Sequence, residues 1–273
     1  MNALSVAECL ACAGIPRLEA QMLLEAVTGM TRVALITRPE HPITAAHAAT
    51  FRVWCARRQT GEPIAYLLGR REFYSLEFAV SADVLIPRPE TELLVDLALG
   101  RIAEGARRIV DLGTGSGAIA IAIAKNAPAA EVWAVDVSAQ AIAVARANAI
   151  RHGVSIRLVE SDWFAALGNE RFDLIVANPP YVSINDPHLG EGDVRFEPRG
   201  ALVGGVDGLD AICAIVERAA ARLSSGGWIA IEHGYDQGES VSALFSLRGY
   251  LNVLRHNDLA GIWRVTSAVR GPD

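Results

Sequence analysis

The sequence predicts an α/β fold in which a doubly wound, mostly parallel sheet of seven strands follows a small helical domain and a β-hairpin linker. Two observations carry this prediction. From Arg108 onward, short apolar runs alternate with segments of helical periodicity, which is the rhythm of repeated strand–helix–strand units. Before residue 61, the apolar residues recur only at helical spacing.

The first predicted domain, residues 1–60, is a small helical bundle. Its first helix, over residues 4–13, ends before Gly14 and Pro16, which break helices. The third helix covers residues 44–58, with Thr44 as its N-cap. The second helix has an apolar stripe that Gly29 terminates: Leu18, Met22, Leu23 and Ala26. Such a bundle is either purely structural or a module that recognises a partner, and we favour recognition.

Residues 61–86 form the predicted linker, because residues 72–80 alternate between apolar and polar as a β-hairpin strand does. Residues 87–273 form the α/β domain, which starts with a helix over residues 91–99. Its expected strands are 109–112, 131–135, 156–159, 173–177, 228–232, 251–255 and 262–267, and its further helices are 118–126, 139–152, 208–223 and 239–247. The short connection between the last two strands indicates an antiparallel edge.

A glycine-rich turn follows the first of these strands: Asp111, Leu112, Gly113, Thr114, Gly115, Ser116 and Gly117. Glycines at alternate positions allow a tight turn, and a ligand can lie against their bare backbone. Asp136 ends the second strand, where a carboxylate can accept hydrogen bonds from both hydroxyls of a ribose. The pattern therefore predicts a nucleoside ligand. Gly113, Gly115 and Ala118 also match the dinucleotide fingerprint, which is weak evidence when it stands alone.

The turn with Asp136 downstream resembles the class I methyltransferases, whose cofactor is S-adenosylmethionine. Asp111 can supply the carboxylate that the cofactor's sulfonium and amino groups favour. Asp162 and Trp163 follow the third strand, where such enzymes contact adenine, although they are alternatively a helix cap and a surface aromatic. The predicted cofactor-binding residues are Asp111, Gly113, Thr114, Gly115, Ser116, Gly117, Asp136, Val137, Asp162, Trp163 and Asn178.

The most informative element is Asn178-Pro179-Pro180-Tyr181, which follows the fourth strand. Two prolines end the strand, and the residue before a proline is held extended. An amide, a backbone carbonyl and an aromatic ring therefore stand together at the ligand-binding edge of the sheet. This set can hold a planar NH2 group, and we predict that these four residues are catalytic.

Together with this element, nearly the whole chain resembles the release factor glutamine methyltransferases, the HemK/PrmC family. The resemblance is carried by residues 61–69, 85–92, 111–117, 161–164, 178–181, 195–198, 204–209 and 232–234. It implies methyl transfer from S-adenosylmethionine to the glutamine amide in the Gly-Gly-Gln sequence of class I peptide chain release factors. The alternatives are a glutamine of a large-subunit ribosomal protein or, with the same chemistry, an adenine N6 in nucleic acid.

Three further residues lie outside the turn and the proline element. Arg88 and Glu90 either shape a substrate channel or cap a helix. Glu197 lies in a long loop after the predicted active site, and such loops often bind ligands. We expect no bound metal, because Cys9-x-x-Cys12 lacks a second ligand pair.

Composition narrows the function further. The net charge of −6 and the pI of about 5.6 argue against a protein that grips nucleic-acid phosphates. The apolar run at residues 118–124 is too short for a membrane span, and the first eight residues lack signal-peptide features. We expect a monomeric cytoplasmic enzyme with no membrane contact. A non-catalytic Rossmann protein is the remaining alternative, but it leaves the prolines and Tyr181 unexplained.

Overall fold

The computed structural model describes residues 4–271. Residues 1–3 of the predicted helical domain and residues 272–273 of the predicted α/β domain lie outside the described residues. The chain divides into two compact units. One comprises residues up to 70 together with 190–196, and the other comprises 71–189 with 197 onward. The helical unit thus extends ten residues beyond the predicted boundary at 60, because Leu67 is buried in its core.

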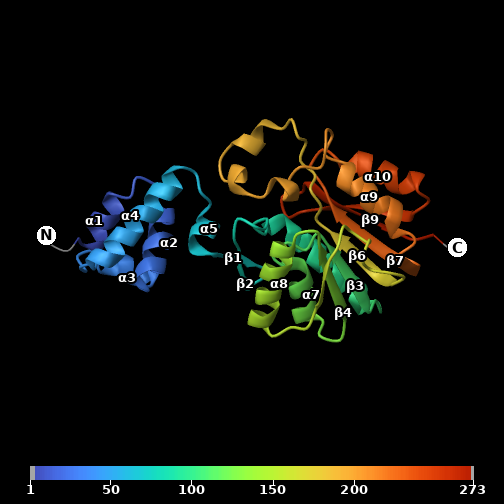
Figure 1. Cartoon of the computed structure of the whole chain (residues 1–273), viewed down its shortest axis with the longest axis horizontal. Coiled ribbons are helices and arrows are strands. Elements are labelled where there is room, and N and C mark those ends of the chain that lie inside the picture. The colour runs from blue at the N-terminus through green and yellow to red at the C-terminus, as the bar shows by residue number, and fades with distance from the viewer. Residues whose placement is uncertain (1–3, 272–273) are drawn as a thin grey trace. The chain divides into compact units, whose positions relative to one another are not determined.

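The helical unit contains α1 (Val6–Ala11), α2 (Arg17–Thr28), α3 (Arg32–Thr37), α4 (Ala45–Gln59) and α5 (Ile64–Leu68) (Figure 1). Thr44 caps α4 as predicted, since its side chain accepts a hydrogen bond from the His47 backbone. Gly29 ends α2 in the left-handed conformation that favours glycine. The sequence did not predict α3 or α5, because helices of five or six residues are too short to show periodicity.

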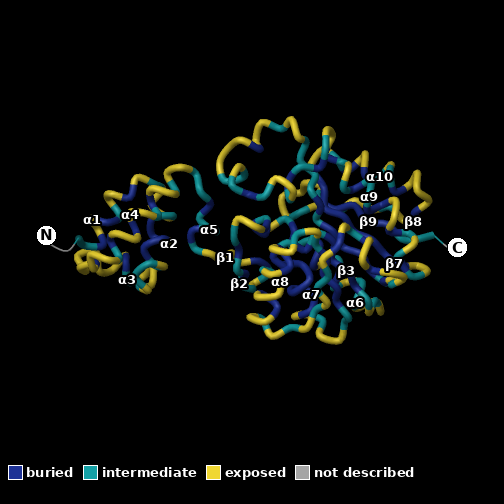
Figure 2. Tube along the Cα trace, viewed as in Figure 1, coloured by how far each residue is buried: buried dark blue, intermediate teal, exposed yellow. Residues whose placement is uncertain are grey.

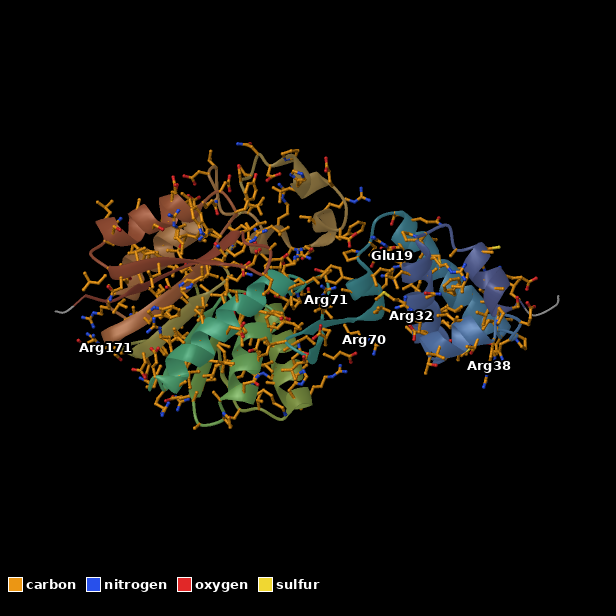
Figure 3. The ribbon with its side chains drawn as sticks, turned by 180° about the vertical axis from the view of Figure 1, so that it is seen from behind. Glu19, Arg32, Arg38, Arg70, Arg71 and Arg171 are labelled. Carbon is orange, nitrogen blue, oxygen red and sulfur yellow. The ribbon has the colours of Figure 1, made fainter. Side chains whose placement is uncertain are left out.

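An ion-pair cluster supports the helical unit beside its apolar core. Arg58 of α4 donates to both carboxylate oxygens of Glu19 on α2, at 2.8 and 2.9 Å (Figure 3 labels Glu19). The same guanidinium donates to Asp193 at 2.6 Å. Arg195 contacts the Thr60 backbone carbonyl. These contacts explain why residues 190–196 belong to this unit although they lie far along the chain.

A two-stranded sheet, β1 (Arg70–Phe73) with β2 (Leu76–Ala79), forms the predicted hairpin. Tyr74 and Ser75 join the strands with φ of +52° and +59°. Positive φ at both positions is the geometry of a type I′ turn, whose twist matches that of the strands.

The predicted seven-stranded sheet is confirmed, with the order β5-β4-β3-β6-β7-β9-β8. The pairs β3–β4, β3–β6, β4–β5 and β6–β7 are parallel, whereas β9 runs antiparallel to both β7 and β8. The strands are β3 (Arg108–Leu112), β4 (Glu131–Asp136), β5 (Arg157–Glu160), β6 (Phe172–Ala177), β7 (Leu223–Glu232), β8 (Leu251–Asn257) and β9 (Trp263–Val269).

Helices cover both faces of this sheet (Figure 1). One face packs against α6 (Glu92–Ala103), α7 (Ala118–Asn126) and α8 (Ala139–His152), and the other against α9 (Asp210–Ala219) and α10 (Gly238–Leu247). Because both faces are covered, the central strands are largely apolar and mostly buried (Figure 2). Within residues 4–271, no helix is both long and apolar enough to cross a bilayer.

Two predicted helices have different bounds in the structure. The helix predicted from residue 91 is a 3-10 turn, η1 (Pro89–Thr91), followed by α6, because Pro89 is confined to the first turn. The helix predicted over residues 208–223 is shorter, since Gly208 has a φ of +77° and β7 already begins at Leu223. Further 3-10 turns are η2 (Pro187–Gly190), η3 (Val194–Phe196) and η4 (Arg199–Ala201).

The strand order reverses between β3 and β6, because β4 lies on one side of β3 and β6 on the other. Leu112 at the end of β3 pairs with Ala177 at the end of β6. The next residues along the chain are Gly113 and Asn178, so the register brings the glycine turn and the proline element side by side. Ligands of open α/β sheets bind at such a switch point.

Candidate active site

A cavity of about 250 Å³ lies at this switch point. Four strand ends contribute to its lining, and seven of the predicted cofactor residues are among them: Gly113, Gly115, Asp136, Val137, Asp162, Trp163 and Asn178. Asp111, Thr114, Ser116 and Gly117 lie behind this lining. Two segments that the sequence did not associate with the cavity complete its wall, residues 83–85 and residues 198–201.

The glycine turn allows close packing on both of its sides. Gly117 has a φ of +82°, and a Cβ there would lie 2.9 Å from the Ile121 side chain and 3.1 Å from the Cβ of Ala145. Glycine therefore lets α7 start directly after the turn while α8 packs against it. Gly113 has a φ of +74°, and a Cβ there would lie 3.5 Å from the indole ring of Trp163.

Asp136 is oriented towards the cavity by the backbone around it. Its Oδ2 accepts a hydrogen bond from the Gly115 N–H, and its Oδ1 accepts one from the Ser138 N–H, both at 2.9 Å. Burial raises the pKa of this carboxyl, while these backbone donors favour the charged form. A carboxylate held in this way keeps lone pairs on both oxygens for two neighbouring hydroxyls of a ligand.

Asp111 lies beneath the turn and is fully buried. Its Oδ2 accepts a hydrogen bond from the Thr114 hydroxyl at 2.6 Å, and its Oδ1 has no hydrogen-bond partner among the described residues. Burial raises the pKa of Asp111 to about 7. The carboxyl therefore braces the turn and can present a charge to a cation above it.

Trp163 has a φ of +48°, which is uncommon for a bulky residue. This conformation lets the indole reach across to Gly113 and line the cavity. Strained backbone of this kind is typical of ligand sites, where the surroundings compensate for it. Asp162, the preceding residue, also lines the cavity and places a second carboxylate along the same wall.

The Asn178 amide is held at one end and free at the other. Its Nδ2 donates to the Thr91 hydroxyl at 3.1 Å. Its Oδ1 is buried and has no hydrogen-bond partner among residues 4–271. Buried acceptors are almost always satisfied in native proteins, so an unpaired one beside a cavity points to a ligand that donates. Asn178 therefore lines the cavity and carries an acceptor that has no partner among the described residues.

The Tyr181 ring is anchored by its hydroxyl, which donates to Glu232 Oε1 at 3.2 Å. Burial, followed by the negative charge of Glu232, raises the pKa of Tyr181 well above its usual range. Glu232 ends β7 and is itself buried. Tyr181 is therefore neutral, and the hydrogen bond from its hydroxyl to Glu232 holds its own ring in place.

Two glycines support the proline element from behind. A Cβ on Gly204 would lie 2.4 Å from the Pro180 carbonyl oxygen, and one on Gly208 would lie 2.2 Å from that of Tyr181. The Val182 N–H donates to the Leu202 carbonyl at 2.8 Å, which ties the two segments together. Backbone thus packs on backbone here, and the position of the proline element depends on these glycines.

Glu197 is buried and pairs with Arg88. Its Oε2 also accepts a hydrogen bond from the Ile86 N–H at 3.0 Å. The pair joins residues 198–201 to residues 83–85, which are the two segments that complete the cavity wall. A direct substrate contact for Arg88, Glu90 or Glu197 stays a prediction.

Comparison with known proteins agrees with this geometry. Residues 90–189 match the model of the methyltransferase small domain, and residues 4–69 match the PrmC N-terminal domain. A release factor glutamine methyltransferase from Bordetella pertussis is 51% identical over 259 residues, covering 94% of this chain and 96% of the relative. One from Burkholderia pseudomallei is 49% identical, covering 96% and 95%. The chain belongs to the release factor glutamine methyltransferase family.

The predicted family resemblance is therefore confirmed. A crystal structure of a methyltransferase from Pyrococcus furiosus has the same fold, with a TM-score of 0.55 at 21% identity, covering 79% of this chain and 97% of that one. In this member of the release factor glutamine methyltransferase family, the seven cofactor residues named above and Pro180 line one cavity, whereas Pro179 and Tyr181 of the proline element are not part of its lining.

Sequence reasoning missed the partners behind the proline element. Thr91 was predicted only as the first residue of a helix, and Glu232 was matched to the family without a role. A carboxylate as the last residue of an apolar strand, at the ligand-binding edge, was the available signal for Glu232. For Thr91 the sequence holds no signal, because its contact with Asn178 spans 87 residues.

Proposed function

We propose that this chain transfers a methyl group from S-adenosylmethionine to the side-chain amide nitrogen of the glutamine in the Gly-Gly-Gln sequence of class I peptide release factors. The observation that carries the proposal is the Oδ1 atom of Asn178, which is buried and has no hydrogen-bond partner among residues 4–271. A primary amide has two N–H donors, so it satisfies this acceptor. Family membership supports the choice of a glutamine amide.

The cavity residues fit the proposed cofactor. Asp136 would accept hydrogen bonds from the ribose hydroxyls, and Asp162 would accept one from the exocyclic amine of adenine. Trp163 offers an aromatic surface beside Gly113, and Asp111 offers negative charge beneath the turn. When bound, the cofactor's sulfonium supplies an activated methyl group.

The proline element would orient the reacting nitrogen. Because the lone pair of an amide nitrogen is delocalised into its carbonyl, the enzyme must direct it at the methyl group. Asn178 Oδ1 and the Pro179 carbonyl would accept the two N–H bonds, and Tyr181 would stack on the amide plane and exclude water. Orientation supplies roughly 7–11 kcal/mol in favourable cases. The nitrogen becomes strongly acidic after transfer, so its proton can leave without a dedicated base.

The helical unit is the proposed recognition module for the release factor. Two apolar residues of α3 are largely exposed, Val33 to 69% and Ile36 to 59%. Arg32 starts this helix and Arg38 follows it (Figure 3). Exposed apolar residues bordered by charge are typical of protein interfaces. Replacing Val33 and Ile36 by aspartate should raise KM for the release factor and leave kcat at saturation unchanged.

One assay tests the function. The chain is incubated with methyl-labelled S-adenosylmethionine and, in separate reactions, a release factor, its Gly-Gly-Gln variant with Gln→Ala, the large-subunit ribosomal protein and DNA. Label in the release factor that is lost in its Gln→Ala variant supports the proposal. Label only in the ribosomal protein or only in DNA would replace it with one of the two alternatives.

A further inference from the structure

We propose that Ile184, Val206 and Tyr235 form a docking platform beside the proline element, which binds the segment of the substrate protein that flanks the methylated glutamine. The inference rests on the proposed function and deepens it, because it names a contact area and the chemistry of the segment that fits there. The three residues are 51%, 74% and 71% exposed, respectively. Large apolar side chains exposed together on loops beside an active site are typical of binding surfaces.

The three platform residues lie in loops that leave the ligand-binding edge of the sheet. Ile184 lies in the loop after β6, Val206 lies further along the same connection before α9, and Tyr235 lies in the loop after β7. Strands β6 and β7 are parallel neighbours, so the loops that follow them start at the same edge. The proline element starts at this edge as well.

Hydrogen bonds join the Ile184 and Val206 segments. The Ile184 N–H donates to the Gly205 carbonyl at 2.8 Å, and the Ser183 hydroxyl donates to the Val206 carbonyl at 2.7 Å. The backbone of both segments is therefore fixed by internal partners, while the side chains of Ile184 and Val206 stay exposed.

The Gln237 side chain joins the Tyr235 loop to the other two segments. Its Nε2 donates to the carbonyls of Tyr181 and Asp207, both at 3.1 Å, and its Oε1 accepts from the Gly234 N–H at 2.8 Å. The platform is thus held directly against the proline element. A surface that is fixed before its partner arrives loses less conformational entropy on binding.

The loops around the platform carry negative charge. Residues 182–189, 203–210 and 234–237 contain no arginine or lysine. Their carboxylates are Asp186, Asp207, Asp210 and Asp236. Their one histidine, His188, contacts Asp186 at 2.8 Å. Charge of one sign around an apolar patch favours a partner of the opposite sign. The segment that fits therefore carries arginine or lysine next to an apolar side chain, whereas nucleic-acid and lipid phosphates would be repelled.

The platform lies within reach of the residues that flank the glutamine. Ile184 follows Tyr181 by three residues. An extended chain covers at most about 3.6 Å per residue, so their Cα atoms lie within roughly 11 Å of each other. When the substrate glutamine occupies the proline element, substrate residues about three or four positions away from it can contact the platform.

The double variant Val206→Ser/Tyr235→Ser tests the apolar contacts. Both side chains are exposed, so the variant should fold, which thermal unfolding would verify. Removing two central apolar contacts typically weakens a protein interface about tenfold or more. We expect the KM for the release factor to rise by that factor, while kcat at saturation and the affinity for S-adenosylmethionine stay near the wild-type values.

Ile150→Ser/Leu247→Ser is the matched control. Ile150 on α8 and Leu247 on α10 are 76% and 81% exposed, so this variant loses the same kind of surface away from the platform. Its KM should equal that of the wild type. A wild-type KM in Val206→Ser/Tyr235→Ser, or an equal rise of KM in the control, would overturn the inference.

Asp236 tests the charge of the partner separately, because this exposed residue can be changed without altering the apolar side chains. The KM for the release factor should rise from the wild type to Asp236→Asn and again to Asp236→Lys. These differences should shrink at high salt, which screens exposed charges. Equal KM values in all three proteins at low salt would contradict a basic partner segment.

Peptides locate the contact in the flanking residues. Two synthetic peptides carry Gly-Gly-Gln with about four residues on each side, which are alanine and serine in one peptide and arginine and leucine in the other. The basic, apolar peptide should have the lower KM with the wild type, and Val206→Ser/Tyr235→Ser should remove this advantage. Equal KM values of the two peptides with the wild type would overturn the proposal. If neither peptide is methylated, the KM of the double variant for the release factor decides.

The remaining outcomes separate this proposal from the proposed function. A wild-type dimer in sedimentation that the double variant converts to a monomer would assign the platform to a second copy of the chain and overturn the inference. A wild-type enzyme that labels no release factor contradicts the proposed function. An active wild-type enzyme whose double variant keeps the wild-type KM contradicts only the docking platform.

Discussion

Gly204→Ala is the substitution whose effect can be worked out most directly from the structure. The added Cβ would lie 2.4 Å from the Pro180 carbonyl oxygen and 2.7 Å from that of Gly208. The first distance is about 1 Å inside ordinary van der Waals contact. Both neighbours are backbone, so the proline element must shift by a comparable amount. A misplacement of about 1 Å at a reacting group costs roughly 100-fold in rate, and we expect that loss in kcat.

The assay measures kcat with methyl-labelled S-adenosylmethionine and release factor, and cofactor affinity by calorimetry. Cofactor affinity should fall less than kcat, because only Asn178 and Pro180 of the displaced element line the cavity. Overpacking typically also lowers the free energy of unfolding by about 1–3 kcal/mol, which thermal unfolding would report. Gly190→Ala is the control from the same connection, since a Cβ at Gly190 meets nothing within 4 Å.

Two results would refute this reasoning. A Gly204→Ala enzyme with wild-type kcat would show that the proline element tolerates displacement. A matching loss of kcat in Gly190→Ala would show that the loop, rather than the contact with Pro180, controls the reaction.

Three further predictions concern single carboxyl and amide groups. Asn178→Ala should lower kcat by about 100-fold or more and leave cofactor affinity nearly unchanged, because it removes the acceptor for the reacting NH2 group; equal losses in both quantities would contradict this role. Asp136→Ala should weaken S-adenosylmethionine binding in calorimetry, and an unchanged Kd would refute the ribose assignment. Asp111 and Glu232 have raised pKa values because they are buried, so the folded state binds more protons than the unfolded state between about pH 4 and 7. Their contribution to stability is therefore lost as pH rises across that window, and Asp111→Asn should make the free energy of unfolding, measured by denaturant titration, decline less steeply from pH 4.5 to 7 than in the wild type.

Local sequence patterns were sufficient to predict the sheet and most of the helices of this protein. Alternation of apolar runs and helical segments predicted the parallel sheet, because each strand must be buried on both faces and each crossover needs a helix. The same rules put Asp111 to Gly117, Asp136 and Asn178 to Tyr181 at strand ends, and parallel strands bring those ends to one edge. The predicted cofactor and catalytic residues could be chosen for this reason without any long-range information.

Contacts between distant segments could not be predicted. The pair of Arg88 with Glu197 spans 109 residues, and nothing local to either residue indicates the other. The cavity wall at residues 83–85 lies in a segment predicted only as a linker. Residues 190–196 belong to the helical unit because Arg58 donates to Asp193. These two residues are 135 positions apart in the sequence, so only folding brings them together.

The sequence by itself determined which groups are present at the sheet edge and what chemistry they favour, since residue type and strand position follow local rules. Only the tertiary structure decided how the Asn178 amide is oriented. Its donor end is taken by Thr91, and its acceptor end is left for a ligand. That difference depends on Thr91 of η1 meeting Asn178 directly after β6, and a hydrogen bond between residues so far apart in the sequence is set by packing rather than by sequence proximity.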